Sequence, residues 1–365
     1  MTDTSVFQTA NEPLQQTGPL PFAFSGTGSE YFRIWIVNLL LSIVTLGIYS
    51  AWAKVRRLKY FYGNTTVANS SFEYHGNPVA ILKGRFVAVI LIIAYNLALK
   101  SSGIVALAMI VAVAFAMPWL VWKSLQFKLY NSSYRGIRFG FRGSLKQSYL
   151  VYLLWPLVSG ITLFLAAPFA HQRLKRFQHQ ESRFGSTHFS FDATVGGFYK
   201  RYLIFFVIWL AGFIVIALLF GGALVGLIMG GGITRDASGS VGAAGYVTIF
   251  AFVFAMYVWM FLVFPIFATL IQNLIWNNTR LGLHQFQSNM KWSRVSFIAI
   301  TNILGVICTL GLYIPFAQIR YMKYRVESMS LQPDGSLDHI VAATQAQTSA
   351  TGEGVSDLLD FDLSL

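Results

Sequence analysis

Two stretches near opposite ends of the chain share one pattern. Residues 33–60 align with residues 297–324 without a gap, with 13 identities in 28 positions. The tripeptide Thr-Leu-Gly recurs at 45–47 and 309–311, where an apolar run gives way to a basic, aromatic one, and a weaker copy begins at Thr162. Self-similarity of this kind is the signature of a repeat architecture. We place three internal repeats near residues 30–62, 147–179 and 294–326.

Composition indicates that these repeats lie in a lipid rather than an aqueous environment. The chain is 55% hydrophobic and 11% charged, whereas a soluble domain carries about 25% charged residues. Several apolar runs reach the roughly 20 residues that a bilayer crossing needs. The sequence therefore predicts an all-α multi-pass membrane protein with about seven apolar segments. Its membrane domain would cover 21–332, with helical hairpins at 86–122 and 202–271 between the repeats.

Both ends of the chain differ from this membrane domain. Residues 1–20 are polar, and residues 333–365 carry six acidic side chains without any Lys or Arg. Segments with few apolar residues and a biased charge remain disordered because they cannot form a core. We predict disordered tails at both ends, the second one acidic.

The loops between the apolar segments contain short strand-like pieces. Four of them alternate as aromatic-x-aromatic, which is the period-2 pattern of a strand with one buried face. Two further pieces follow the pattern more weakly, and Asn-rich turns recur beside them at 64–66, 131–133 and 277–279. The six candidate strands lie at 22–26, 72–76, 139–143, 189–192, 283–287 and 328–331.

Charge distribution favours one topology over another. Seven ordinary crossings would divide the 27 Lys and Arg residues 16 to 11 between the two sides, a weak bias for the positive-inside rule. Four full crossings plus three re-entrant repeat segments would place 25 of the 27 on one side. Gly47, Gly311 and Pro168 would supply the bends. We expect this second arrangement, with both termini cytoplasmic, although the sequence leaves seven crossings open.

Basic residues recur at matching positions of the three repeats. They lie three residues apart and so share a helix face. They could bind phospholipid headgroups or another anion; alternatively, they only anchor the chain at the inner membrane surface, with their side chains extended toward water. These candidate lipid or anion contacts are Arg56, Lys59, Arg173, Arg176, Arg320 and Lys323.

Polar side chains also recur within the repeats. Asn38 and Asn302 fall mid-segment at equivalent positions, and Tyr49 and Tyr313 follow the Thr-Leu-Gly tripeptides. These four residues could line an intramembrane pocket. The alternative is that the two asparagines join helices by hydrogen bonds.

Recognisable catalytic or metal-binding patterns are missing from the sequence. The six histidines are scattered without the spacing of metal ligands, and Cys308 is the one cysteine. The four apolar segments of the two hairpins contain no ionisable side chain, although ion-coupled transporters usually keep such groups there. We therefore expect no cofactor, no metal and no enzymatic activity.

Several motifs together resemble one known family, the YjgN-like bacterial inner-membrane proteins, which are defined by a domain of unknown function. The resemblance covers about 20–332 and implies a location in the bacterial inner membrane, but it supplies no substrate and no catalytic residues. The motifs that carry it are Phe-Ser-Gly-Thr-Gly at 24–28, Glu-Tyr-Phe at 30–32, Asn38, Thr-Leu-Gly-Ile-Tyr at 45–49, Arg-Phe-x-Phe at 138–141 and Trp-x-Asn-Thr-x-x-Gly-x-His-x-Phe at 276–286.

Two functions are the main candidates at this stage, and a membrane enzyme with unrecognised chemistry is the least favoured third. The first is a role in binding or transporting lipids or small solutes, with anionic membrane lipids as partners. The second is a structural or assembly role in which the acidic tail recruits a cytoplasmic protein. A nucleic-acid partner is not expected despite the net charge of +13, because the basic residues cluster beside apolar segments, where lipid headgroups account for them.

Overall fold

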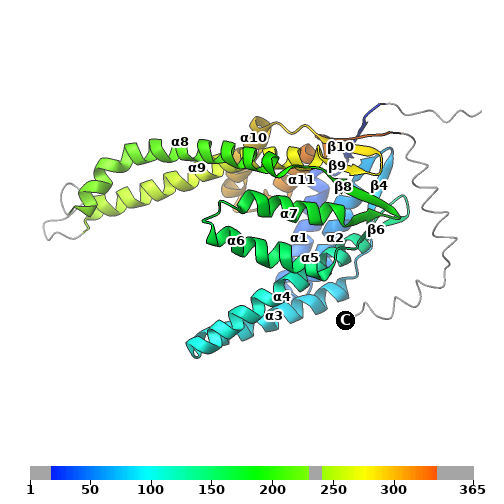
Figure 1. Cartoon of the computed structure of the whole chain (residues 1–365), viewed down its shortest axis with the longest axis horizontal. Helices are drawn as coiled ribbons and strands as arrows, with labels where there is room; N and C mark the ends of the chain where they lie inside the picture. Colours follow the sequence, from blue (N-terminus) through cyan, green and yellow to red (C-terminus); the bar gives the residue numbers. More distant parts are fainter. Residues whose placement is uncertain (1–17, 230–240, 335–365) are drawn as a thin grey trace, which may run out of the picture.

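The computed structural model describes residues 18–229 and 241–334 and is mostly helical (Figure 1). The helices are α1 (Gly28–Val44), α2 (Ser50–Gly63), α3 (Pro78–Lys100), α4 (Gly103–Tyr130), α5 (Leu145–Tyr149), the π-helical η1 (Leu150–Leu154), α6 (Trp155–Ile161), α7 (Ala167–Gln180), α8 (Val195–Ile228), α9 (Ala243–Trp276), α10 (Trp292–Cys308) and α11 (Ile314–Glu327). The strands are β1 (Leu20–Pro21), β2 (Ala23–Phe24), β3 (Thr65–Val67), β4 (Ser70–Tyr74), β5 (Ser132–Tyr134), β6 (Ile137–Phe141), β7 (Ser182–Phe184), β8 (Thr187–Phe191), β9 (Thr279–Leu281), β10 (His284–Ser288) and β11 (Met329–Gln332).

The strands form one antiparallel, barrel-like sheet. Its order is β1-β11-β10-β9-β8-β7-β6-β5-β4-β3-β2, so β1 and β2 occupy the two ends. Only Phe22 separates these two strands in sequence, and its backbone N–H donates to the carbonyl of Met329 at 3.0 Å. The chain on either side of Phe22 therefore joins both ends of the sheet.

Five units of one design surround this sheet. In each unit a strand leads into a pair of helices, and a second strand returns to hydrogen-bond with the first. Unit 1 consists of β2, α1, α2 and β3; unit 2 of β4, α3, α4 and β5; unit 3 of β6, α5, η1, α6, α7 and β7; unit 4 of β8, α8, α9 and β9; and unit 5 of β10, α10, α11 and β11. Short turns connect the units. Ala68 and Asn69 make one of them with φ values of 45° and 58°, the left-handed conformation that tight hairpins require.

The return from helix to strand uses the same hydrogen bond in all five units. A Ser or Thr hydroxyl beside the helix end donates to the backbone carbonyl four residues earlier, at 2.6–2.8 Å. This bond satisfies one of the carbonyls that a helix C-terminus leaves without a partner. The five hydroxyls belong to Thr65, Ser132, Ser182, Thr279 and Ser328.

The helix pairs of units 1, 3 and 5 share one turn at their far end. In unit 1, Thr45 Oγ1 donates to the carbonyl of Leu41 at 2.7 Å and accepts from the N–H of Tyr49 at 2.9 Å. Thr162 and Thr309 make the corresponding bonds. Leu46, Leu163 and Leu310 all have a φ of 50°. The next residue is also left-handed: Gly47, Phe164 and Gly311 have φ values of 91°, 66° and 94°.

The helix pairs of units 2 and 4 are much longer. Their four helices, α3, α4, α8 and α9, are long and apolar enough to cross a membrane. In Figure 1 both pairs extend from the strands toward the left of the view and diverge from each other. α8 and α9 approach closely at Gly212, where an added Cβ would lie 1.9 Å from a ring atom of Trp259. The Trp259 indole N–H also donates to the carbonyl of Trp209, at 3.1 Å.

The structure differs from the sequence-based expectations in two places. The Asn-rich segments are not only turns, because β3, β5 and β9 begin directly after the helix ends and pair with the aromatic strands. In unit 3 the bend is made by Leu163 and Phe164, whereas Pro168 lies in the first turn of α7. The predicted tails at 1–20 and 333–365 lie almost entirely outside the described residues.

Candidate functional site

A closed ring of five phenylalanines fills the middle of the sheet. Each unit supplies one, from its first strand or, in unit 1, from the residue before it: Phe22, Phe72, Phe139, Phe189 and Phe286. Neighbouring ring centroids are 6.0–6.5 Å apart all the way round. The planes of neighbouring rings differ by only 11–31°. If the five ring planes instead contained the sheet's axis, neighbouring planes would differ by about a fifth of a full turn. The five side chains therefore lie nearly flat across the sheet's axis.

The second strand of each unit completes this layer. Directly across the strand pairs, Phe72 faces Tyr134 and Phe139 faces Phe184, and residues opposite each other in an antiparallel pair share a face. The residues that the second strands contribute are all buried: Val67, Tyr134, Phe184, Leu281 and Leu331. The phenylalanine ring and these side chains together close the sheet's axis with apolar groups.

A cavity of about 460 Å³ lies between the phenylalanine ring and the helices; we call it the axial cavity. All five units contribute to its wall. Beside the ring, the wall includes apolar side chains of the second helices, among them Leu125, Leu129 and Trp276. Its polar lining includes Lys128 of α4 and Gln178 and His179 of α7, together with Ser132 and Ser182 at the starts of β5 and β7. This is the usual composition of a small-molecule site, mostly apolar with a few polar groups.

Cations from four second helices lie near one another, and one of them, Lys128, lines the axial cavity. Burial lowers the pKa of the Lys175 ammonium, and the charges of Arg325 and Lys128 lower it further. Burial also lowers the pKa of Lys54, as do the charges of Arg85 and Lys128. Among the described residues, no acidic side chain lines the cavity. The cavity therefore offers a positive potential that favours an anion.

His179 contributes a neutral polar group rather than a further charge. Its imidazole is stacked on Phe191, with centroids 5.3 Å apart, and Nδ1 is 3.3 Å from the hydroxyl of Thr279. Burial and the nearby charge of Lys175 lower the pKa of His179 from 6.5 to about 4. The ring is thus uncharged at neutral pH, with a nitrogen available to a ligand or to Thr279.

The basic residues predicted from the repeats lie outside the axial cavity. Arg173 lies over Phe169 with its guanidinium carbon 4.9 Å from the ring centroid, and Arg320 donates to Thr301 Oγ1 at 2.7 Å. Lys323 pairs with Glu327 at 3.8 Å. Arg176 donates to Gln180 at 3.2 Å, while Arg56 and Lys59 are exposed on α2. These six residues occupy matching places on three helices, and the four contacts described above all lie within the residue's own helix pair.

The four polar residues predicted to line a pocket are also separate from the axial cavity. Asn302 donates to the carbonyl of Ala317 at 3.1 Å and so joins α10 to α11. Asn38 is buried in α1, and its side-chain oxygen has no hydrogen-bond partner within the described chain. Tyr49 stacks on Trp52 at the tip of unit 1, and Tyr313 stacks on Phe316 at the tip of unit 5.

The residues that do form the cavity were not singled out by sequence. The aromatic-x-aromatic strands were recognised, but not that the first aromatic of each would meet its four counterparts. Lys128 and Lys175 belong to different units and share no spacing pattern. One signal was available: five Ser or Thr residues, each just beyond a second helix, mark equivalent positions from which the inward-facing neighbours can be counted.

Comparison with known proteins places the chain in a family. Residues 19–358 match the family model described as bacterial protein of unknown function (DUF898). The chain belongs to this family. It is 31% identical over 150 residues to inner membrane protein YjgN of Salmonella typhimurium (strain LT2), which is 39% of this chain and 36% of that relative. It is 32% identical over 146 residues to the protein of that name from Escherichia coli (strain K12), covering 38% and 35% of the two chains.

The names of the relatives agree with the long apolar helices of this structure. The matched region spans about a third of the length of these curated relatives. No solved structure matches the chain. Because the relatives are named inner membrane proteins and four described helices are long and apolar enough to cross a bilayer, the protein is a multi-pass membrane protein, with support for an inner-membrane location.

Proposed function

We propose that this DUF898 protein binds an anionic amphiphile, a molecule with an acidic head and an apolar body, in the axial cavity. The observation that carries the proposal is the cavity's division into two chemistries. Aromatic and aliphatic side chains form most of its wall, while Lys128 lies in the wall and Lys175 and Arg325 lie close by. A wholly polar solute would leave the apolar wall unmatched, and an uncharged lipid would leave the cations unmatched.

The size and electrostatics of the cavity suit such a ligand. Its volume of about 460 Å³ falls within the roughly 300–1,000 Å³ of typical small-molecule pockets. Apolar groups gain about 25 cal/mol per Å² that they remove from water, which favours an apolar body beside the phenylalanine ring. Lys175 is partly buried among other cations, so an acidic head there would relieve repulsion between like charges.

We infer that the ligand enters from the membrane side. The phenylalanine ring closes the sheet's axis at the other end of the cavity. The helix ends face the cavity from the opposite side, and the helices themselves carry the apolar surface. A lipid-like molecule could therefore pass between the helix pairs without leaving the bilayer.

The same arrangement supports re-entrant segments in units 1, 3 and 5. Both strands of each unit lie in one sheet, so each short pair enters and leaves on the same side. α2, α7 and α11 have 14 residues each, about 21 Å at 1.5 Å per residue, which is too short for a hydrocarbon core of about 30 Å. Their tips are nonetheless apolar and bare, with Leu46, Leu163 and Leu310 exposed by 94%, 84% and 96%. We infer that these three tips insert into one leaflet, while the long pairs of units 2 and 4 cross.

This topology also predicts how the protein is oriented in the membrane. With the sheet and the loops around it on one side, the count from the sequence puts 25 of the 27 Lys and Arg residues there. Lys100, at the far end of α3, is one of the two exceptions. The positive-inside rule then makes the sheet cytoplasmic. The axial cavity would therefore take its ligand from the cytoplasmic leaflet.

A binding measurement on the purified full chain tests the proposal. The probe is a fluorescent long-chain fatty acid, compared with the same chain ending in an alcohol. In the double variant Lys128→Gln/Lys175→Gln we expect affinity for the acid to fall at least about tenfold, or roughly 1.4 kcal/mol, with little change for the alcohol. Lys123→Gln/Lys146→Gln, which removes two exposed cations outside the cavity, is the matched control. Equal affinity in parent and cavity variant would overturn the proposal.

A further inference from the structure

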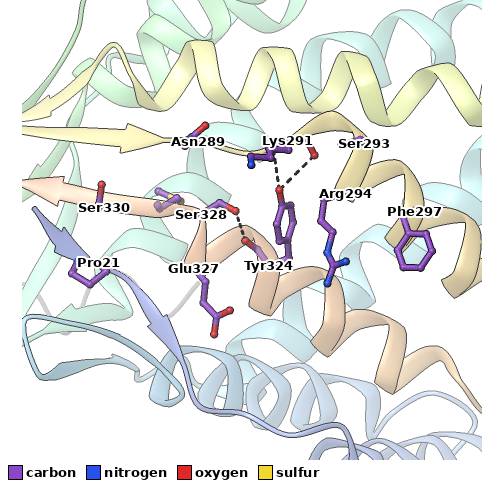
Figure 2. A pocket seen from close by; sticks show the side chains of 11 residues that line it. Pro21, Asn289, Lys291, Ser293, Arg294, Phe297, Tyr324, Glu327, Ser328 and Ser330 are labelled. Atoms are coloured by element: carbon purple, nitrogen blue, oxygen red, sulfur yellow. Dashed lines mark hydrogen bonds between the residues drawn. The ribbon is translucent and has the colours of Figure 1, made fainter.

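A second hollow lies outside the sheet, where α10 and α11 meet β11; we call it the α10 groove (Figure 2). It is an open groove of about 780 Å³. We propose that the α10 groove binds the phosphate headgroup of an anionic phospholipid from the surrounding leaflet. This site goes beyond the axial cavity and does not depend on that cavity being occupied.

Two cations line the groove and a third lies just beyond it. In Figure 2 the side chain of Arg294 lies between Tyr324 and Phe297, with Lys291 above them. The Arg294 guanidinium carbon is 5.8 Å from the Phe297 ring centroid, and that of Arg320 is 5.5 Å from the same centroid. Phe297 thus holds two guanidiniums close to one ring. Each keeps N–H donors in the planar fork that suits phosphate oxygens.

The rest of the groove is fixed by hydrogen bonds. The hydroxyl of Tyr324 accepts from the backbone N–H of Lys291 at 2.8 Å, which ties the start of α10 to α11. Arg320 is held by Thr301 Oγ1 at 2.7 Å. Because the backbone at one end and a guanidinium at the other are already held, a headgroup would order few side chains on binding.

Charge selects an anionic lipid over a zwitterionic one. The groove contains one acid, Glu327, but Lys323 Nζ lies 3.8 Å from its carboxylate. That pair is close to neutral, which leaves Lys291 and Arg294 unbalanced by acids of the groove. An ammonium-bearing headgroup would therefore meet more repulsion than attraction.

The surface beside the groove continues as a lipid's acyl chains would require. From Arg294 the exposed face of α10 changes to the aromatic Phe297 and then to the aliphatic Leu304 and Ile307, ending at the bare tip residue Leu310. Cation, aromatic and aliphatic groups follow in the order of headgroup, interface and hydrocarbon. The cations thus lie at phosphate depth while the tip lies among acyl chains.

Unit 1 keeps the backbone geometry of the α10 groove without its two cations. By the repeat alignment, Thr27 stands where Lys291 does, and Glu30 where Arg294 does. Tyr60, the counterpart of Tyr324, makes the same contact, accepting from the N–H of Thr27 at 2.9 Å. The geometry is therefore kept in both units, but only unit 5 carries positive charge at these two positions.

This comparison supplies the test variant, Lys291→Thr/Arg294→Glu, which gives unit 5 the residues that unit 1 already tolerates. The full chain would be placed in vesicles of phosphatidylglycerol diluted in phosphatidylcholine, and bound lipid would be counted by native mass spectrometry after extraction. We expect phosphatidylglycerol binding to be at least about 25-fold weaker than in the parent, since the variant removes two cations and each cation near an anionic surface contributes about a factor of five. Arg294→Lys should retain most of it.

Three outcomes would contradict the proposal. The variant could retain as much phosphatidylglycerol as the parent. Soluble glycerol phosphate could compete as well as the lipid does, which would make the groove a site for free phosphate. The axial variant Lys128→Gln/Lys175→Gln could lose the same phosphatidylglycerol, which would assign that lipid to the axial cavity. Loss in the groove variant alone would support the α10 groove even if the axial proposal fails.

Discussion

The strands of this protein are nearly uniform from unit to unit, whereas its helix pairs are not. Every unit contributes one phenylalanine to the ring and one hydroxyl beside its second helix. The second helices of the pairs range from the 14 residues of α2 to the 34 of α9. A closed sheet fixes the position of each strand, because any change of register moves its inward side chains. A helix pair that ends in lipid has no such constraint, so length can vary between units.

The largest effect is expected where the uniform region is broken. Phe72→Ala/Phe189→Ala removes two non-adjacent members of the phenylalanine ring and leaves cavities that the closed sheet cannot collapse. Because both rings are partly buried, each substitution should cost about 2–4 kcal/mol of unfolding free energy, seen as a large fall in the thermal unfolding midpoint in detergent. Phe72→Leu/Phe189→Leu should recover much of this loss. If alanine were tolerated without a change in that midpoint, the ring would not be a packed layer.

Acid should weaken the same region through His179. Its pKa is lowered from 6.5 to about 4, so the unfolded chain takes up a proton below about pH 6.5 while the folded chain does not. The contribution of His179 to the unfolding free energy is therefore fully present above pH 6.5. It is lost as the pH drops toward 4, by on the order of 3 kcal/mol. Unfolding midpoints measured across this range should show the slope.

His179→Gln is the matched variant for this pH dependence, because an amide can still hydrogen-bond Thr279. His171 has a similarly lowered pKa of about 4, caused by burial and then by Lys175. We therefore expect His179→Gln to remove about half of the slope and His171→Gln/His179→Gln to remove most of it. A slope unchanged in the double variant would assign the dependence to other groups.

Among the helix pairs, which vary between units, the long pair α8 and α9 should be sensitive to substitution at its closest contact. Gly212→Val places a side chain against Trp259, whose ring atom already lies 1.9 Å from a built Cβ, so α8 and α9 must separate. We expect a loss of about 1–3 kcal/mol, with the phenylalanine ring intact. Gly222→Val, where nothing lies within 4 Å of a built Cβ, should cost less. Equal losses would contradict the close packing at Gly212.

The smallest effect is expected at the shared turn. Thr309→Val removes the bond to the carbonyl of Gly305 and the one from the N–H of Tyr313, for about 1 kcal/mol. Thr248→Val, in the long pair, removes one bond, to the carbonyl of Ala244, and should cost less still. Unfolding midpoints of the two variants in detergent can be compared directly. A larger effect at Thr248 would reverse the expected order.

The sequence was informative where a pattern is local. Apolar length predicted the four long helices, and the Thr-Leu-Gly copies pointed to turns that prove to share one geometry. Aromatic alternation located the longer strands, although it missed β3, β5, β7 and β9, which have three residues each, too few to show a period. The three copies were also too narrow a description, because units 2 and 4 hold equivalent places in the sheet.

The site was harder to predict because it depends on closure. Nothing local tells that Phe22 lies beside Phe286, which is 264 positions away, since that contact requires β1 and β2 to join opposite ends of the sheet. Lys128 and Lys175 come near each other because α4 and α7 belong to neighbouring units of the sheet, which no spacing in the sequence reveals. The repeated basic residues were conspicuous in sequence because they recur, yet recurrence placed them on the outer parts of three helices rather than around the axis.

The central claim, that the axial cavity holds an anionic amphiphile, is tested most directly by photo-crosslinking in intact cells. Benzoylphenylalanine would replace Tyr62, an aromatic residue in the cavity wall, and separately Tyr130, an exposed tyrosine on α4 that does not line the cavity. Mass spectrometry would then identify the adducts. We expect one class of acidic amphiphile at position 62, absent at 130 and lost in the Lys128→Gln/Lys175→Gln background. The same bulk phospholipids at both positions, or no adduct at 62, would contradict the account.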